Sequence, residues 1–135
     1  MASQLNPYLT FPGTARQAME FYRDVFGGTL TMNTFGEYGD PTAANADQIM
    51  HAYLEADNGF ALMGSDTPDG SVPAANGPIA ISLSGDDAAA LRGYWEKLSA
   101  AGDVAVPLGK QMWGDEFGAC TDQFGISWMV DIAPQ

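Results

Sequence analysis

The sequence is poor in the residues that build most cross-linked and catalytic sites. Its 135 residues include one cysteine, Cys120, and one histidine, His51. A single chain therefore cannot form a disulfide framework or a site that needs two histidine ligands. Lys and Arg number 5 against 17 Asp and Glu, which gives a formal net charge of −12. Because such a surface repels phosphate backbones and anionic lipids, we expect no nucleic-acid or membrane partner.

Long apolar runs are also absent. No stretch approaches the roughly 18 consecutive apolar residues of a bilayer-spanning helix. The first ten residues have neither the basic start nor the apolar core of a secretory signal, so we expect a cytoplasmic protein. Hydrophobic residues still make up 46% of the chain, and at the length of one typical domain this is enough for a substantial core.

Two segments have the periodicity of amphipathic helices. Between residues 15 and 26, apolar side chains recur at three- and four-residue intervals. Thr14 and Gln17 form a capping-box pattern at the start of this segment. The same apolar spacing recurs between residues 91 and 98, and Ser84 is the expected N-cap of that second helix.

Short strand-like runs surround each helix, in the order strand, helix and three strands, twice over. Asn58-Gly59 is a two-residue hairpin signal. A two-residue turn there places Leu54 opposite Met63 and turns His51 to the face away from Met63. The predicted strands cover residues 5–11, 30–35, 49–56 and 60–63 in the first half, and 79–83, 104–108, 119–121 and 126–132 in the second.

The repeated order predicts an α+β fold of two βαβββ modules. We place the modules at about residues 5–66 and 79–133, joined by a hinge at about residues 64–78 that is rich in Gly, Pro, Ala, Asn and Asp. Three or four strands and one helix make a thin core. We therefore expect both modules to belong to a single domain over residues 1–135.

Several motifs follow one another in a fixed order along nearly the whole chain. Together they resemble the vicinal oxygen chelate superfamily, which has the glyoxalase, bleomycin-resistance and extradiol dioxygenase fold, and they are closest to its PhnB-like branch. The resemblance implies two modules whose curled sheets meet around a cup, and a homodimer. The motifs are PYLTF at 7–11, ARQAMEFY at 15–22, FGG at 26–28, IMHA at 49–52, MGSD at 63–66, WGDEFG at 113–118 and TDQFGISWM at 121–129.

The resemblance also implies where a metal would bind in the metal-using members. Their ligands, usually His, Gln or Glu, come from the first and last strand of each module and hold a divalent ion that chelates two substrate oxygens. The matching last-strand positions here are Met63 and Met129. A hard divalent ion prefers oxygen or imidazole to a thioether. We therefore predict no metal and no other cofactor, with a divalent metal on relocated ligands as the alternative.

The candidate ligand-binding residues combine apolar bodies with a few polar tips, which suits a small, aromatic organic ligand. The same residues could instead fill the core. His51 is open to a role as base or ligand and to a purely structural role. Residues 109–118 are expected to form a loop whose tryptophan acts as a lid or interface residue. The candidates are Tyr8, Thr10, His51, Met63, Trp113 and Met129.

Three functions stay open, and the sequence does not decide whether the protein is an enzyme. The first is a metal-independent small-molecule binding protein that sequesters an antibiotic-like or aromatic compound as a homodimer. The second is a metal-dependent lyase, isomerase or dioxygenase with relocated ligands. The third is a PhnB-like structural or interaction domain whose cup is core. The thioethers at the metal positions favour the first.

Overall fold

The computed structural model describes residues 3–69 and 79–135. The chain forms two compact units, Met1–Pro73 and Ala74–Gln135, and each is described here by itself. Each unit contains one four-stranded mixed sheet and one twelve-residue helix. Within the described ranges no helix is long and apolar enough to cross a membrane.

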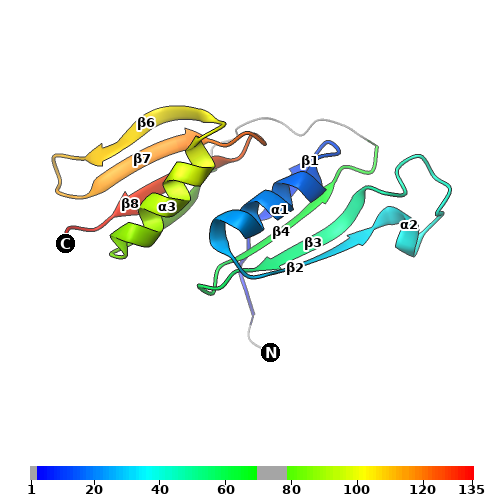
Figure 1. Cartoon of the computed structure of the whole chain (residues 1–135). Helices are drawn as coiled ribbons and strands as arrows, with labels where there is room; N and C mark the ends of the chain where they lie inside the picture. Colours follow the sequence, from blue (N-terminus) through cyan, green and yellow to red (C-terminus); the bar gives the residue numbers. More distant parts are fainter. Residues whose placement is uncertain (1–2, 70–78) are drawn as a thin grey trace. The chain divides into compact units, whose positions relative to one another are not determined.

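The first unit is a sheet with one long helix against it. Its strands lie in the order β1-β4-β3-β2, with β1 parallel to β4 and the other neighbours antiparallel. Helix α1 lies along one face of this sheet (Figure 1). The elements are β1 (Tyr8–Phe11), α1 (Ala15–Phe26), β2 (Thr29–Thr34), the short α2 (Phe35–Tyr38), β3 (Ile49–Glu55) and β4 (Ala61–Asp66).

The second unit repeats this plan. Its strands lie in the order β5-β8-β7-β6, again with one parallel pair, β5 and β8. The repeated order confirms the predicted α+β class with two βαβββ modules. The elements are β5 (Ile81–Gly85), α3 (Ala88–Ser99), β6 (Asp103–Lys110), β7 (Glu116–Thr121) and β8 (Ser127–Ile132).

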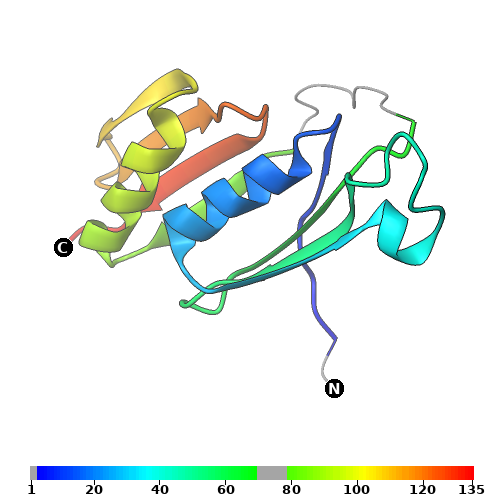
Figure 2. The ribbon, with the colours of Figure 1, turned by 45° about the vertical axis from the view of Figure 1, so that its right-hand side comes forward.

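The core of the first unit lies between α1 and the sheet. The apolar positions predicted to form one face of the helix are all buried, and alternate residues of β1, β3 and β4 meet them. The helix lies over the same side of the sheet in a second view (Figure 2). Because α1 packs on one face of the sheet, it does not cover the opposite face. The core residues from α1 are Ala15, Ala18, Met19, Tyr22, Val25 and Phe26, and those from the strands include Leu9, Phe11, Ala52, Leu54 and Leu62.

The predicted capping box of α1 and the predicted N-cap of α3 are wrong, although Thr14 does occupy the N-cap position of α1. The Thr14 side chain caps nothing. Instead, Oδ1 of Asp66, at the end of β4, accepts the backbone N–H groups of Gly13 and Ala15, both at 2.9 Å. A cap from a distant strand satisfies the helix start as well as a local one, but no local pattern reveals it. In the second unit the N-cap is Asp87 and not Ser84.

The turn between β3 and β4 has three residues and not two. The Ala56 N–H donates to the Phe60 carbonyl at 2.8 Å, and the glycine that ends the turn has a φ of 87°. Three-residue hairpin loops of this kind place a left-handed residue last. As a result Tyr53, and not Leu54, lies opposite Met63. The predicted register is therefore wrong by one residue.

The expected hinge at residues 64–78 begins too early. Its first three residues belong to β4, and residues 70–78 lie outside the described part of the chain. Glycine is common in loops, which is why Gly64 was expected in the hinge. In the structure Gly64 lies in β4, where the neighbouring atoms leave little room for a side chain. An added Cβ would lie 3.0 Å from the Leu9 carbonyl oxygen and 3.2 Å from Met19 Sδ.

The expected loop at residues 109–118 is also shorter than predicted. Strand β6 continues to Lys110 and β7 begins at Glu116. Residues 111–115 form the connection, which is closed by a 2.8 Å bond from the Gln111 N–H to the Asp115 carbonyl. The alternation in these strands is weak because β6 has two register shifts against β7, and such shifts break the two-residue period.

Candidate functional site

The face of the first sheet that α1 does not cover carries polar, aromatic and thioether side chains. We call it the open face of the first sheet. Strand pairing places Met63 beside Tyr8 on one side and beside Tyr53 on the other, and His51 is two residues from Tyr53 on the same strand. Side chains two apart on a strand share a face. By the same pairing the open face comprises Tyr8, Thr10, Thr29, Thr31, Asn33, His51, Tyr53, Glu55, Ala61, Met63 and Ser65.

His51 therefore shares the face of Met63. The expectation that it turns away from Met63 is wrong, because that expectation depended on a two-residue turn. The structure brings four of the six candidates, Tyr8, Thr10, His51 and Met63, to this one face. Trp113 and Met129 belong to the second unit.

The centre of the open face is formed by three side chains from three strands. The rings of Tyr8 and His51 have centroids 6.0 Å apart and planes tilted by 30°. Strand β4, which carries Met63, runs between their strands. Nδ2 of Asn6 lies 3.9 Å from Met63 Sδ, within reach of a weak N–H···S hydrogen bond. Tyr8 is 49% exposed, so its ring is available to a ligand.

In the second unit, Met129 occupies the position that Met63 has in the first. It lies beside Ser82 of β5 and Ala119 of β7, on the side of the sheet opposite the buried Trp128 and Val130. Trp113 lies in the connection between β6 and β7. It is 59% exposed, and its ring meets that of Phe117 edge-on at a centroid distance of 6.3 Å.

Two carboxyl groups also meet in the second unit. A hydrogen bond with Asp115, assisted by burial and by that neighbour's negative charge, raises the pKa of Asp131 above its usual range. The adjacent Glu116 instead pairs with Arg92 of α3. The acids at residues 115 and 116 are therefore engaged with side chains of their own unit.

Cys120 has the character of an inert, packed thiol. It is buried in β7 and free. Burial, assisted by the nearby charge of Asp122, raises the pKa of its thiol to about 11. Because the thiolate is the reactive form, this cysteine is poorly suited to nucleophilic chemistry.

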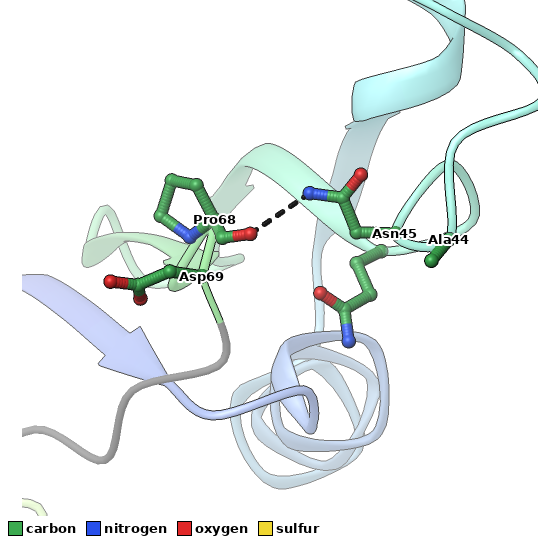
Figure 3. Close-up of a pocket in the computed structure, with 5 residues that line it drawn as sticks. Ala44, Asn45, Pro68 and Asp69 are labelled. Atoms are coloured by element: carbon green, nitrogen blue, oxygen red, sulfur yellow. Dashed lines mark hydrogen bonds between the residues drawn. The ribbon is translucent and has the colours of Figure 1, made fainter.

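A groove of about 450 Å³ lies beside the loops of the first unit (Figure 3). Nδ2 of Asn45 donates to the Pro68 carbonyl at 3.0 Å across it. None of the described residues that line the groove is aromatic or basic, so it offers a small organic ligand less than the open face does. Its lining residues are Ala44, Asn45, Gln48, Pro68 and Asp69.

Comparison with known proteins supports the relationship that the motifs suggest. A model of the Glyoxalase/Bleomycin resistance protein/Dioxygenase superfamily matches residues 4–130. The chain belongs to this superfamily. Protein YjdN of Escherichia coli (strain K12) is 24% identical over 143 residues, which cover 97% of this chain and 96% of YjdN.

Solved structures of the superfamily fold agree with this assignment. The crystal structure of PA1353 from Pseudomonas aeruginosa has 37% sequence identity and a TM-score of 0.86, and the match covers 99% of this chain and all (100%) of that one. The PhnB protein from Bacillus cereus has 23% identity and a TM-score of 0.76, over 97% of this chain and 100% of its own. The superfamily resemblance is therefore confirmed, and the fold is shared with a PhnB protein, the branch to which the motifs point.

The side chains at the superfamily's metal positions do not fit a hard divalent ion. Met63 and Met129 present thioethers, and their neighbours on the parallel strands are Tyr8 and Ser82. Among residues 3–69 and 79–135 no three His, Cys, Asp or Glu side chains come together as a metal-binding group. Moving a divalent ion from water to such donors would cost several kcal/mol.

Asn33 and Tyr53 are two of the open-face residues that were not among the candidates. Asn33 lies directly opposite His51 on β2, and Tyr53 lies beside Met63. The position of Tyr53 could have been predicted, because it lies two residues from His51 on the same strand and therefore shares its face. The place of Asn33 depends on the pairing of β2 with β3, which the sequence does not specify.

Proposed function

We propose that this protein is a metal-independent binding protein for a small aromatic molecule, and that the open face of the first sheet holds the ligand. The observation that carries the proposal is the convergence of Tyr8, His51 and Met63 at the centre of that face. An aromatic ring, an imidazole and a polarizable thioether make favourable contacts with a flat organic ring.

The exposure of Tyr8 argues against the alternative that this face is part of the core. Its central tyrosine is about half exposed, whereas Leu9 and Phe11, the next residues on the same strand to face α1, are 8% and 1% exposed. A core position would be covered as its neighbours are. The face is therefore available surface, and surface of this composition is characteristic of ligand contact.

We propose retention of the ligand and not its turnover as the activity. Within the described residues the imidazole of His51 contacts the Tyr8 ring and forms no side-chain hydrogen bond or ion pair. A histidine that acts as a base is usually oriented by a second group. Sequestration of an antibiotic-like or aromatic compound by a homodimer, as the superfamily resemblance implies, is the form we favour. Sedimentation equilibrium tests the dimer.

Nuclear magnetic resonance of the methionine methyl groups can test the proposal. Protein carrying ¹³C-methyl methionine is treated with a chelator and titrated with a library of aromatic fragments. The Met63 signal is assigned with Met63→Leu. Met19 of α1 is fully buried. Its methyl signal, which is assigned with Met19→Leu, is the internal control.

We expect at least one fragment to shift the Met63 signal saturably while the Met19 signal stays in place. The proposal fails if no fragment shifts the Met63 signal. It also fails if every shift requires an added divalent metal, because that result supports the metal-dependent alternative.

A further inference from the structure

The open face of the first sheet differs in charge from the rest of the chain. The chain carries a net charge of −12, yet in residues 3–69 the one carboxylate on this face is Glu55, at the end of β3. The centre of the face is free of carboxylates. The other acidic side chains of this range lie on the helices, in loops or on the side of α1, and they are Glu20, Asp24, Glu37, Asp40, Asp47, Asp57, Asp66 and Asp69.

His51 is the side chain of this face that can carry a positive charge, since the five Lys and Arg residues lie on other elements. It is half-buried. No carboxylate of the described residues pairs with it, and its ring contact is with Tyr8. Its N–H groups therefore remain available to an acceptor from outside the chain.

The neighbours of His51 add further donors. Asn33 lies opposite it on β2 and has an amide with two N–H groups, and the hydroxyl of Tyr8 can donate as well. A donor-rich centre that excludes carboxylates complements a ligand with an anionic oxygen.

The acidic net charge does not reverse this preference. Attraction of a cation by distant carboxylates is screened over about 8 Å at physiological ionic strength. Groups in direct contact with the ligand therefore decide its charge class. At the centre of this face those groups are an imidazole, an amide and hydroxyls.

We propose that the open face of the first sheet recognises a planar aromatic acid, whose ring lies on Tyr8 and Met63 and whose carboxylate accepts hydrogen bonds from His51 and Asn33. This inference rests on the proposed function, which assigns ligand binding to the same face. It adds the charge class of the ligand and the residue that selects it.

The test compares three probes with the same ring, benzoate, benzamide and benzylamine, in titrations followed at the Met63 methyl signal. We expect benzoate to bind at least about ten times more tightly than benzamide, and benzylamine to bind most weakly. His51→Gln should bring the benzoate-to-benzamide ratio close to one, because the glutamine can donate a hydrogen bond but cannot carry a charge. Lys110→Gln, which removes one exposed positive charge from the other unit, should leave the ratio unchanged.

The inference is overturned if benzylamine binds as tightly as benzoate, or if His51→Gln keeps the full preference while its circular dichroism shows a folded protein. It is also overturned if none of the three probes shifts Met63 while uncharged fragments do. In these cases the proposed function survives. If no fragment of any charge shifts Met63, both proposals fail. The comparison of the three probes on the unmodified protein decides the charge class even if a variant does not fold.

Discussion

Asp66 holds three parts of the first unit together. Its carboxylate is 2% exposed. Oδ1 accepts the N–H groups of Gly13 and Ala15, and Oδ2 accepts that of Ile49, each at 2.9 Å. The carboxylate therefore joins the end of β4 to the start of α1 and the start of β3. We predict that Asp66→Ala lowers the free energy of unfolding of this unit substantially.

The size of the loss follows from the three donors left behind. A buried N–H without a partner costs about 1–3 kcal/mol. The groups of Ala15 and Ile49 are buried, and that of Gly13 is partly open to water. We therefore expect a loss of about 3–5 kcal/mol for Asp66→Ala. Asp66→Asn keeps the shape and one acceptor but turns an NH₂ group toward one N–H, so we expect about half of that loss.

Hydrogen exchange of individual amides is the suitable assay. All three tryptophans of the chain lie in the second unit, at positions 95, 113 and 128, so none of them is a local probe of Asp66. We expect the amides of Ala15 and Ile49 to lose protection in Asp66→Ala. Asp47→Ala, which removes an exposed carboxylate, should change stability by less than about 0.5 kcal/mol. A loss below about 1 kcal/mol in Asp66→Ala would refute the reasoning.

Three other predictions concern stability and reactivity. Gly28→Ala should destabilise the unit far more than Gly59→Ala in urea titrations, because both glycines have positive φ but an added Cβ meets the Glu55 carbonyl oxygen at 2.1 Å only at Gly28; equal losses would contradict this. Cys120, with a pKa of about 11, should resist iodoacetamide at pH 8 until the protein is unfolded, and rapid labelling of the folded protein would contradict this. The raised pKa of Asp131 means that the contribution of its pair to stability is present in acid and lost as pH rises through that pKa. Asp131→Asn should accordingly stabilise the protein at pH 7 by less than about 1 kcal/mol, with no gain near pH 3, and a gain that is larger in acid would contradict the assignment.

Local periodicity was sufficient to predict the repeated fold. The buried stripe of α1 and the strand order could be predicted because apolar spacing is a property of neighbours in sequence. The capping group of α1 could not, since it comes from Asp66, about fifty residues away. The cap of α3 is local, because Asp87 accepts the Ala90 N–H, and the choice of Ser84 was simply wrong. Thr14 had the right residue type for a cap, but a stronger acceptor from β4 occupies its place.

The positions of some candidate residues on the sheet could be predicted and those of others could not, and the ligand-binding role of all of them stays a prediction. Tyr8 and Met63 were grouped correctly because they follow the alternation of their own strands. His51 was turned to the wrong side because its placement depended on the number of residues in one turn. Asn33 was missed because strand pairing is a long-range property that a single sequence leaves open.

The three-residue turn between β3 and β4 constrains how insertions and deletions can be tolerated. If one residue were lost and the turn kept its three-residue form, a strand residue would be drawn into the turn and the two sides of that strand would exchange, so that Leu54 would face away from the core and His51 toward it. Loss or gain of two codons would preserve the sides. A gap of one residue in an alignment at this hairpin therefore marks a misplaced gap, a turn of another length, or a protein whose imidazole has left the open face of the first sheet.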